Sequence, residues 1–396
     1  MEAEDFSIEN ETQVEIAALF RDRLGAVPTE SFLRDPKLVS IVSPLIQKHA
    51  QNEVATLEQR MSVPCPIRND MGQLRMAFTN IALDGFAGSE LWTLEMASYM
   101  HRSAVPTIVY SPHLGAVAEK FAIKGFEITD DLGMLEAFAP TVLHTHHQQE
   151  TAQARIAVGP NCRQVNMIHG LLPHPEWPGA DMDAYVAVSL HAKAKTALLG
   201  PPGWDDITLM PNFFDPKRFG NKQAERRSNA LLHSSRVTDV NIRQMQGVLE
   251  QHGLTLDHIG YGGTVEASPE MVLPQYNVVF AAGRSAIEAL ASGCHVILWD
   301  QGIVGPAITT GNFWYVLAAN FSVASCILPF VMADDPAMEK WLAEQLLLLE
   351  NPMPLQALVH EYLTVDVIGA RMLAIYDSLS NRASGNKNFA PHASSS

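Results

Sequence analysis

Two hydrophobic patterns alternate along most of the chain. Short apolar runs, which are typical of buried strands, are separated by longer segments whose apolar residues recur at helical spacing. Residues 278–282 and 295–299 are two such runs, and the residues between them have the helical pattern. This alternation predicts an α/β fold with parallel sheets that helices cover on both faces.

The alternation runs through two cycles. Strands of the first cycle are expected at residues 75–83, 106–110, 141–144, 164–168 and 184–189. Strands of the second cycle are expected at residues 229–234, 254–260, 278–282 and 295–299. We therefore predict two doubly wound, Rossmann-like domains at residues 71–220 and 221–365, joined by a polar, proline-bearing linker at residues 211–227.

The two ends of the chain depart from this pattern. Residues 1–70 predict an N-terminal helical extension, which we expect prolines such as Pro44 to interrupt. The first residues are acidic and contain no apolar core of signal-peptide length. Residues 381–396 are rich in Ser, Asn and Ala, which predicts a disordered tail.

Composition narrows the classes of function. The net charge is −16 and no basic stripe interrupts it, which argues against nucleic-acid binding. The four cysteines lie far apart with no CxxC pair, which argues against a zinc ribbon and indicates a reducing, cytoplasmic location. No apolar run reaches the roughly 18 residues of a transmembrane helix, so only peripheral contact with a membrane is left open.

The turn between the last two predicted strands is the strongest candidate for a ligand site. Ligands of doubly wound sheets bind beyond the carboxyl ends of the strands, at helix N-termini that attract phosphate. Gly283, Arg284 and Ser285 lie there, and we expect Ser285 to be the N-cap of a helix that ends at a left-handed Gly293. Glu288 adds a carboxylate that can bind sugar hydroxyls, so the segment predicts a nucleotide site.

Three further turns are expected at ligand-binding edges of the two sheets. Ser235 and Arg236 end the strand at residues 229–234, where the guanidinium suits a diphosphate and a surface ion pair is the alternative. Gly262 belongs to a glycine-rich turn that lets a base or ribose approach. Gly88 lies in a GxxG turn, which suits either a ligand contact or a tight strand-to-helix connection.

Histidines follow two predicted strands of the first domain. No carboxylate follows His144, His146 and His147 at ligand spacing, so substrate contacts or surface positions are favoured over a zinc site. His169 ends the next strand and is expected to face the same cleft. It either orients a transferred sugar or is a structural histidine in a strand-end turn.

In their order and spacing, these motifs resemble a glycosyltransferase of the GT-B fold, specifically glycosyltransferase family 4. The resemblance rests on LDGFAGSE, PTVLHTHHQ, IHG, DAYVAVS with ITLMPNFFD, SSR and GRSAIEALASGCHVI, which together span residues 72–300. It implies a central cleft between an acceptor-binding first domain and a second domain that holds a nucleotide-sugar donor. It also implies that a final helix at residues 366–380 returns to the first domain.

The resemblance assigns roles to four residues. Glu288 matches the glutamate that binds the donor ribose, and Arg236 matches the arginine that neutralises the diphosphate. His169 matches the histidine beside the donor sugar. Gly88 matches the glycine-loop position near the phosphate.

The chain departs from the family at two positions. Phe280 stands where a second glutamate is common, and Asn241 stands where a lysine is common. These departures remove a contact with the donor sugar and one phosphate counter-charge. The helix start at Gly283 can offset the loss if Arg284 faces the ligand, and the alternative is that Arg284 points to solvent.

The leading hypothesis is a glycosyltransferase of the hexosyltransferase type. It would transfer a sugar from a nucleotide-diphosphate-sugar to an unidentified acceptor (glycan, lipid-linked or small molecule), with retention of configuration and without a metal or other cofactor. The expected catalytic residues are His169 and Arg236, and the expected donor-binding residues are Gly88, Ser235, Gly262, Gly283, Arg284, Ser285 and Glu288. A nucleotide-sugar epimerase of the same fold and a non-catalytic nucleotide-sugar-binding protein are the alternatives.

Overall fold

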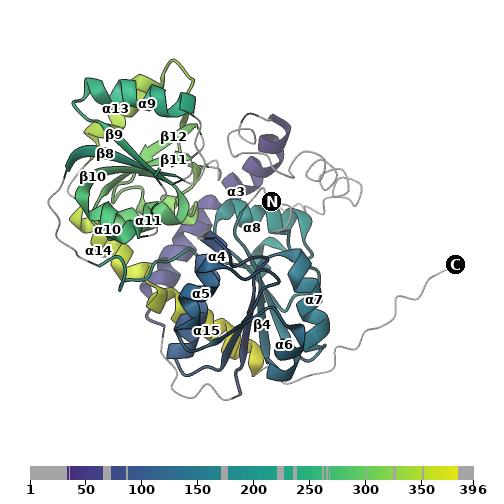
Figure 1. The fold of residues 1–396 in the computed structure, drawn as a ribbon. Coiled ribbons are helices and arrows are strands. Elements are labelled where there is room, and N and C mark those ends of the chain that lie inside the picture. Colours follow the sequence, from purple (N-terminus) through teal and green to yellow (C-terminus); the bar gives the residue numbers. More distant parts are fainter. Residues whose placement is uncertain are drawn as a thin grey trace, which may run out of the picture.

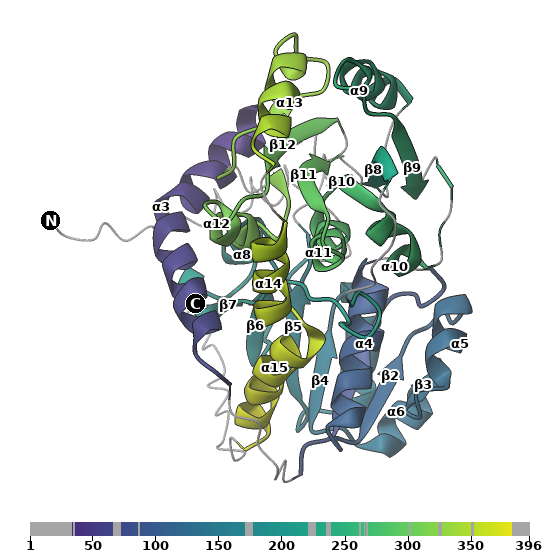
Figure 2. The ribbon, with the colours of Figure 1, turned by 90° about the vertical axis from the view of Figure 1, so that its left-hand side faces the viewer.

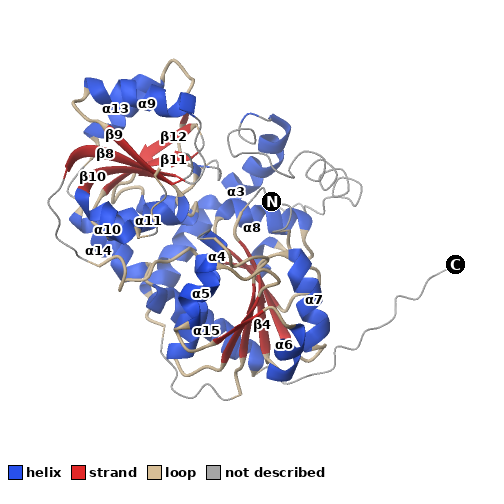
Figure 3. Ribbon diagram, in the orientation of Figure 1, coloured by secondary structure: helices blue, strands red, loops and turns tan. Residues whose placement is uncertain are grey.

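The chain folds into two α/β halves (Figure 1, Figure 3). The structure is a computed structural model, which describes residues 34, 36–65, 73–85, 88–170, 177–220, 227–234, 239–260, 263–264, 266, 268–300, 302–323, 327–349 and 352–381. The predicted tail at residues 381–396 lies outside this part apart from Asn381, as do residues 1–33 of the predicted extension.

The first half contains a parallel sheet of seven strands in the order β3-β2-β1-β4-β5-β6-β7. Its strands are β1 (Met76–Thr79), β2 (Thr107–Tyr110), β3 (Glu127–Thr129), β4 (Val142–Thr145), β5 (Arg163–Ile168), β6 (Ala184–Ala187) and β7 (Ile207–Leu209). Its helices are α4 (Gly88–Arg102), α5 (Ala116–Ala122), α6 (Leu132–Phe138), α7 (Gln148–Val158) and α8 (Leu190–Leu199), followed by the 3-10 turn Trp204–Asp206. The sequence pattern misses β3 and α6, because a three-residue, partly exposed edge strand has no apolar run.

The second half contains a six-stranded sheet in the order β13-β12-β11-β10-β8-β9. Four of its strands are parallel: β8 (Arg227–Ser234), β9 (Leu256–Gly260), β10 (Tyr276–Ala281) and β11 (His295–Asp300). Two unpredicted antiparallel strands, β12 (Ile303–Ala307) and β13 (Val331–Met332), extend it. Its helices are α9 (Asp239–Gln251), α10 (Pro269–Val272), α11 (Gly283–Ala291), α12 (Phe313–Ala318) and α13 (Met338–Leu347), with a 3-10 turn at Leu273–Gln275.

One long N-terminal helix, α3 (Pro36–Ser62), lies along both halves (Figure 2). It packs against α8 of the first half and α12 of the second. Its Glu53 carboxylate accepts hydrogen bonds from Lys193 Nζ at 2.6 Å and Trp204 Nε1 at 2.8 Å. The prediction that Pro44 interrupts this helix is wrong: α3 runs through Pro44, which lies on the exposed side of the helix.

The connection between the two halves is packed rather than loose. Phe213 and Phe214 are fully buried, although the sequence predicts a polar linker there. The Phe214 backbone N–H donates to the Leu363 carbonyl at 3.0 Å, and the Val365 N–H donates to the Phe214 carbonyl at 2.9 Å. One apolar core therefore runs from the first sheet through these phenylalanines to α11 and α12.

The last two helices also join the halves. Helix α14 (Met353–Tyr362) packs against α11, where Gln356 Nε2 and His360 Nε2 lie 2.9 and 3.0 Å from the Ala291 carbonyl and satisfy the end of that helix. Helix α15 (Val365–Ser380) packs against α4 of the first half (Figure 2). A Cβ atom at Gly369 would lie 2.5 Å from Cδ1 of the buried Tyr99, so α15 and α4 approach closely at a glycine.

We predict that Gly369→Ala lowers the free energy of unfolding by about 1–3 kcal/mol, because the added methyl group overpacks the contact with Tyr99. Gly247→Ala is the matched control. Gly247 is exposed within α9 and a Cβ there meets no atom within 4 Å, so alanine should stabilise the protein by about 0.5–1 kcal/mol. Urea unfolding measures both, and equal effects of the two substitutions would contradict the close packing of α15 on α4.

Candidate active site between the two domains

The start of α11 faces the first domain and lacks a capping side chain. β10 ends at Ala281 and α11 begins at Gly283, so the prediction that Ser285 is the N-cap is wrong: the N-cap is Ala282, and Ser285 is the third helical residue. The reason is that Gly283 adopts a φ of +57° and donates its N–H to the Phe321 carbonyl at 2.9 Å, which starts the helix earlier. Among the described residues no side chain caps the first turn, so the N–H groups of Arg284 and Ser285 can bind an anion.

Two of the predicted donor-binding glycines border open space. A Cβ atom built at Gly283 or at Gly88 would meet no described atom within 4 Å. Gly88 is the first residue of α4, so the starts of α4 and α11 each leave room for a ligand to approach the backbone. At the far end of α11, Gly293 has a φ of +77°, which confirms its prediction as the left-handed residue after the helix.

A buried ion pair connects the start of α11 to α4. Nη2 of Arg284 lies 2.5 Å from Oε2 of Glu95, and its Nε lies 2.8 Å from Oε1 of Glu288. All three side chains are at most 10% exposed, so the alternative in which Arg284 points to solvent is excluded. The sequence-predicted Arg284 and Glu288 are therefore brought together, with Glu288 held by the arginine.

A second arginine enlarges this network. Nη1 of Arg218 lies 3.3 Å from Oε1 of Glu95, and its Nη2 lies 2.9 Å from Oε2 of Glu270. Burial alone lowers the pKa of Arg284, but the carboxylates of Glu95 and Glu288 outweigh it, so the pKa lies above its ordinary value and the guanidinium stays charged. Two cations thus face three carboxylates, and the network has no surplus positive charge for a phosphate.

Phe280 lies inside β10 and not at the ligand edge. It is fully buried and packs edge-on against Trp299, with 6.5 Å between the ring centroids. Because a single residue separates β10 from α11, there is no loop at this position that could carry a second glutamate. Asn241, the other departure from the family pattern, lies in α9, and its side chain is outside the described part.

On the opposite side of the site, histidines at the ends of β4 and β5 form a hydrogen-bonded cluster. Nδ1 of His146 lies 2.6 Å from Nε2 of His169, and Nε2 of His146 lies 3.0 Å from Oγ1 of Thr93. His144 is separate from this chain and pairs with the Tyr376 hydroxyl of α15 at 2.8 Å. Among the described residues, no group of three or more His, Cys, Asp or Glu is placed to hold a metal ion.

One set of proton positions on the two imidazoles satisfies every hydrogen bond of this network. The Thr93 hydroxyl donates to the Ser89 carbonyl at 2.8 Å, so its oxygen must accept from Nε2 of His146. Burial holds the pKa of His146 well below its ordinary value, so this imidazole is neutral and its Nδ1 is an acceptor. His169 therefore donates from Nε2, and its Nδ1 carries a free lone pair to which no described residue donates.

His169 is neutral at physiological pH. Burial of the imidazole lowers its pKa to about 3, with smaller contributions from the neighbouring His147 and Lys195. A neutral imidazole with an unprotonated Nδ1 can accept a hydrogen bond from a ligand hydroxyl. This geometry suits an orienting role better than stabilisation of negative charge.

An aromatic pair lies between the histidines and α11. The Trp92 ring lies 5.8 Å from that of His169 and 5.5 Å from that of Phe213, between centroids. The Arg284 guanidinium in turn lies 5.9 Å from the Phe213 ring centroid. Buried aromatic contacts thus connect His169 of the first half to Arg284 at the start of α11.

Three predicted site residues, Ser235, Arg236 and Gly262, lie outside the described part of the chain. Two residues of the ion-pair network, Glu95 and Arg218, were not predicted from the sequence. Glu95 offered a signal, since it is a carboxylate among the apolar residues of α4, but nothing in the sequence paired it with Arg284.

Comparison with known proteins establishes the fold. No protein-family model matches the sequence, and no curated protein matches it. A glycosyltransferase from Rickettsia africae ESF-5 is similar in structure, with a TM-score of 0.52 and 12% sequence identity over 79% of this chain and 100% of that chain. HepE from Anabaena, solved with UDP and glucose, has a TM-score of 0.50 and 14% identity over 77% of this chain and 100% of that chain.

These likenesses confirm the predicted GT-B architecture of two Rossmann-like domains. Each relative aligns over its entire length or nearly so, which means that both domains contribute to the match. Within the part of the chain that the structure describes, every helix is too short or too polar to span a membrane.

We predict that ¹⁵N-histidine NMR finds His169 neutral, with a protonated Nε2 and a bare Nδ1, from pH 7.5 down to pH 5, because its pKa is about 3. Thr93→Val removes the acceptor for Nε2–H of His146 and should allow a mixture of tautomers at both histidines. Thr208→Val in β7, away from the cluster, is the control. A His169 resonance that titrates near pH 6.5 in the wild type would contradict the assignment.

Proposed function

We propose that this protein is a glycosyltransferase that transfers a sugar from a nucleotide-diphosphate-sugar to an acceptor. The observation that carries the proposal is the uncapped start of α11, which opens onto the first domain with Glu288 one turn further along. The GT-B fold shared with a glycosyltransferase and with a UDP-bound protein supports it. We further propose that the enzyme belongs to glycosyltransferase family 4, retains configuration and needs no metal.

The donor diphosphate would lie against the first turn of α11. The N–H groups of Arg284 and Ser285, the Ser285 hydroxyl and the positive end of the helix dipole are available there. The Arg284 guanidinium is already balanced by Glu95 and Glu288, so it orients the turn and does not neutralise phosphate. Arg236 is therefore assigned as the main counter-charge of the leaving group.

The acceptor and the transferred sugar would lie on the side of the first domain. Nδ1 of His169 is placed to accept a hydrogen bond from a sugar hydroxyl. We assign no protein nucleophile. Retention would follow a front-face path in which the glycosidic bond breaks, the leaving diphosphate takes the proton of the acceptor hydroxyl and the acceptor oxygen bonds to the same face of the sugar.

A second candidate is a non-catalytic nucleotide-sugar-binding protein. It is favoured by Phe280, because the position of the second family glutamate is part of the hydrophobic core. In this case the α11 site would bind the nucleotide, and no transfer or hydrolysis of the donor would follow.

We predict that Arg236→Ala lowers turnover roughly 100- to 1,000-fold, the usual effect of losing one group that stabilises the charge of the transition state. The donor for this assay is identified first, by a thermal-shift screen of UDP, GDP, ADP and their sugars, since a ligand that binds the folded protein raises its melting temperature. Turnover is then measured as release of the nucleoside diphosphate.

Arg243→Ala is the matched control, because Arg243 is an exposed arginine on α9. It should leave turnover within about twofold of the wild type, and both variants should melt at the wild-type temperature. Unchanged turnover of Arg236→Ala would refute the assigned role of this arginine. Nucleotide binding without any transfer or hydrolysis across the donor panel would favour the second candidate.

A further inference from the structure

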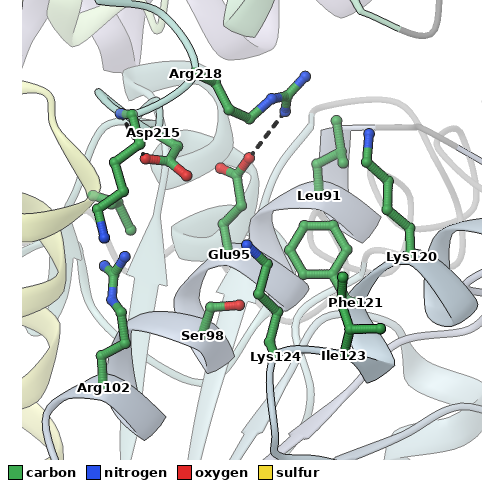
Figure 4. A pocket seen from close by; sticks show the side chains of 12 residues that line it. Leu91, Glu95, Ser98, Arg102, Lys120, Phe121, Ile123, Lys124, Asp215 and Arg218 are labelled. Carbon is green, nitrogen blue, oxygen red and sulfur yellow. Dashed lines mark hydrogen bonds and ion pairs between the residues drawn. The ribbon is translucent and has the colours of Figure 1, made fainter.

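A cavity of about 310 Å³ opens beside the interdomain site, on the side of α4 that faces α5. Its wall contains five cationic side chains, namely Arg102, Lys120, Lys124, Lys217 and Arg218. Figure 4 shows four of them, Arg102, Lys120, Lys124 and Arg218, arranged around Glu95. In a chain with a net charge of −16, this is a local concentration of positive charge.

The carboxylates of the wall cancel only part of this charge. Glu95 and Asp215 line the cavity, and Glu95 is paired with Arg284 outside it and with Arg218. Arg218 is also paired with Glu270, so it adds no surplus charge. Oδ1 of Asp215 accepts the backbone N–H of Lys217 at 2.9 Å. Among the described residues, the ammonium groups of Lys124 and Lys217 form no ion pair with a carboxylate.

The remaining wall is apolar. Leu91, Phe121, Ile123 and Val365 line it, and Ile123 is 86% exposed at the end of α5. A ligand that fits this cavity has an anionic group for the cations and a carbon portion for the apolar wall. Its size matches the small end of ligand-binding cavities, which begin at roughly 300 Å³.

We propose that this cavity binds the phosphate group of a phosphorylated ligand, with the carbon portion of the ligand against Phe121 and Ile123. Phosphate suits the site better than a single carboxylate, because it carries up to two charges and several acceptor oxygens, and it can engage the guanidinium group of Arg102 while lysines contact it as point charges. Nη2 of Arg102 lies 3.2 Å from Oδ1 of the exposed Asp366, so the rest of this guanidinium group can contact the phosphate. The phosphate belongs either to a soluble ester or to a lipid headgroup.

This site is distinct from the start of α11. Its cations come from α4, from α5 and the turn after it, and from the segment that precedes β8, and none of them is a predicted donor-binding residue. Arg218 and Glu95 are the side chains that the two sites share. Phosphate binding in the cavity therefore does not require a nucleotide at α11, and it can be tested independently of glycosyl transfer.

The test compares the full-length wild type with Lys124→Gln/Lys217→Gln. The control is Arg243→Gln/Lys340→Gln, which makes the same change in net charge at exposed positions of α9 and α13. Binding of glycerol 3-phosphate is measured by calorimetry. Binding to phosphatidylcholine vesicles with and without phosphatidic acid is measured by sedimentation, and equal melting temperatures establish that the variants are folded.

We expect the wild type and the control to bind one of the two probes, and the cavity variant to bind it roughly tenfold or more weakly, because charged hydrogen bonds to phosphate are lost. Preference for glycerol 3-phosphate indicates a soluble ester, and preference for phosphatidic acid vesicles indicates a lipid headgroup. The proposal is overturned if the wild type binds neither probe, or if the cavity variant binds as tightly as the control.

Discussion

The ion pair between Glu95 of α4 and Arg284 of α11 is the contact on which the arrangement of the two domains depends. Both side chains are almost fully buried, and Phe213 lies against the arginine. Removing one partner of such a pair leaves an uncompensated buried charge, which typically costs about 3–5 kcal/mol. The contact therefore fixes the start of α11 against the first domain, and with it the geometry of the site.

This constraint decides which groups are left for chemistry. Arg284 and Arg218 are balanced by Glu95, Glu288 and Glu270, so the second domain offers a phosphate mainly backbone N–H groups and the helix dipole of α11. The first domain offers a neutral His169, whose tautomer is set by Thr93 and His146. The second domain thus provides hydrogen-bond donors at the start of α11, and the first domain provides a hydrogen-bond acceptor at His169. This combination suits a ligand that joins a phosphate to a sugar.

Local features were predictable from the sequence, and long-range pairings were not. The strand–helix alternation predicts both sheets, and Gly293 follows the end of α11 as expected, because helix capping depends on residues close in the chain. Glu95 and Arg284 are 189 positions apart, so no local pattern connects them. The strands β12 and β13 were missed because their place in the sheet depends on pairing with β11 and with each other.

A double-mutant cycle on Glu95→Gln and Arg284→Gln tests the central claim most directly. The free energies of unfolding of the wild type, the two single variants and the double variant give the coupling between the two side chains. The ion pair predicts a coupling of at least about 1.5 kcal/mol, as for close charge pairs at buried interfaces. Effects that add within about 0.5 kcal/mol would show that the two side chains act independently and would contradict the account.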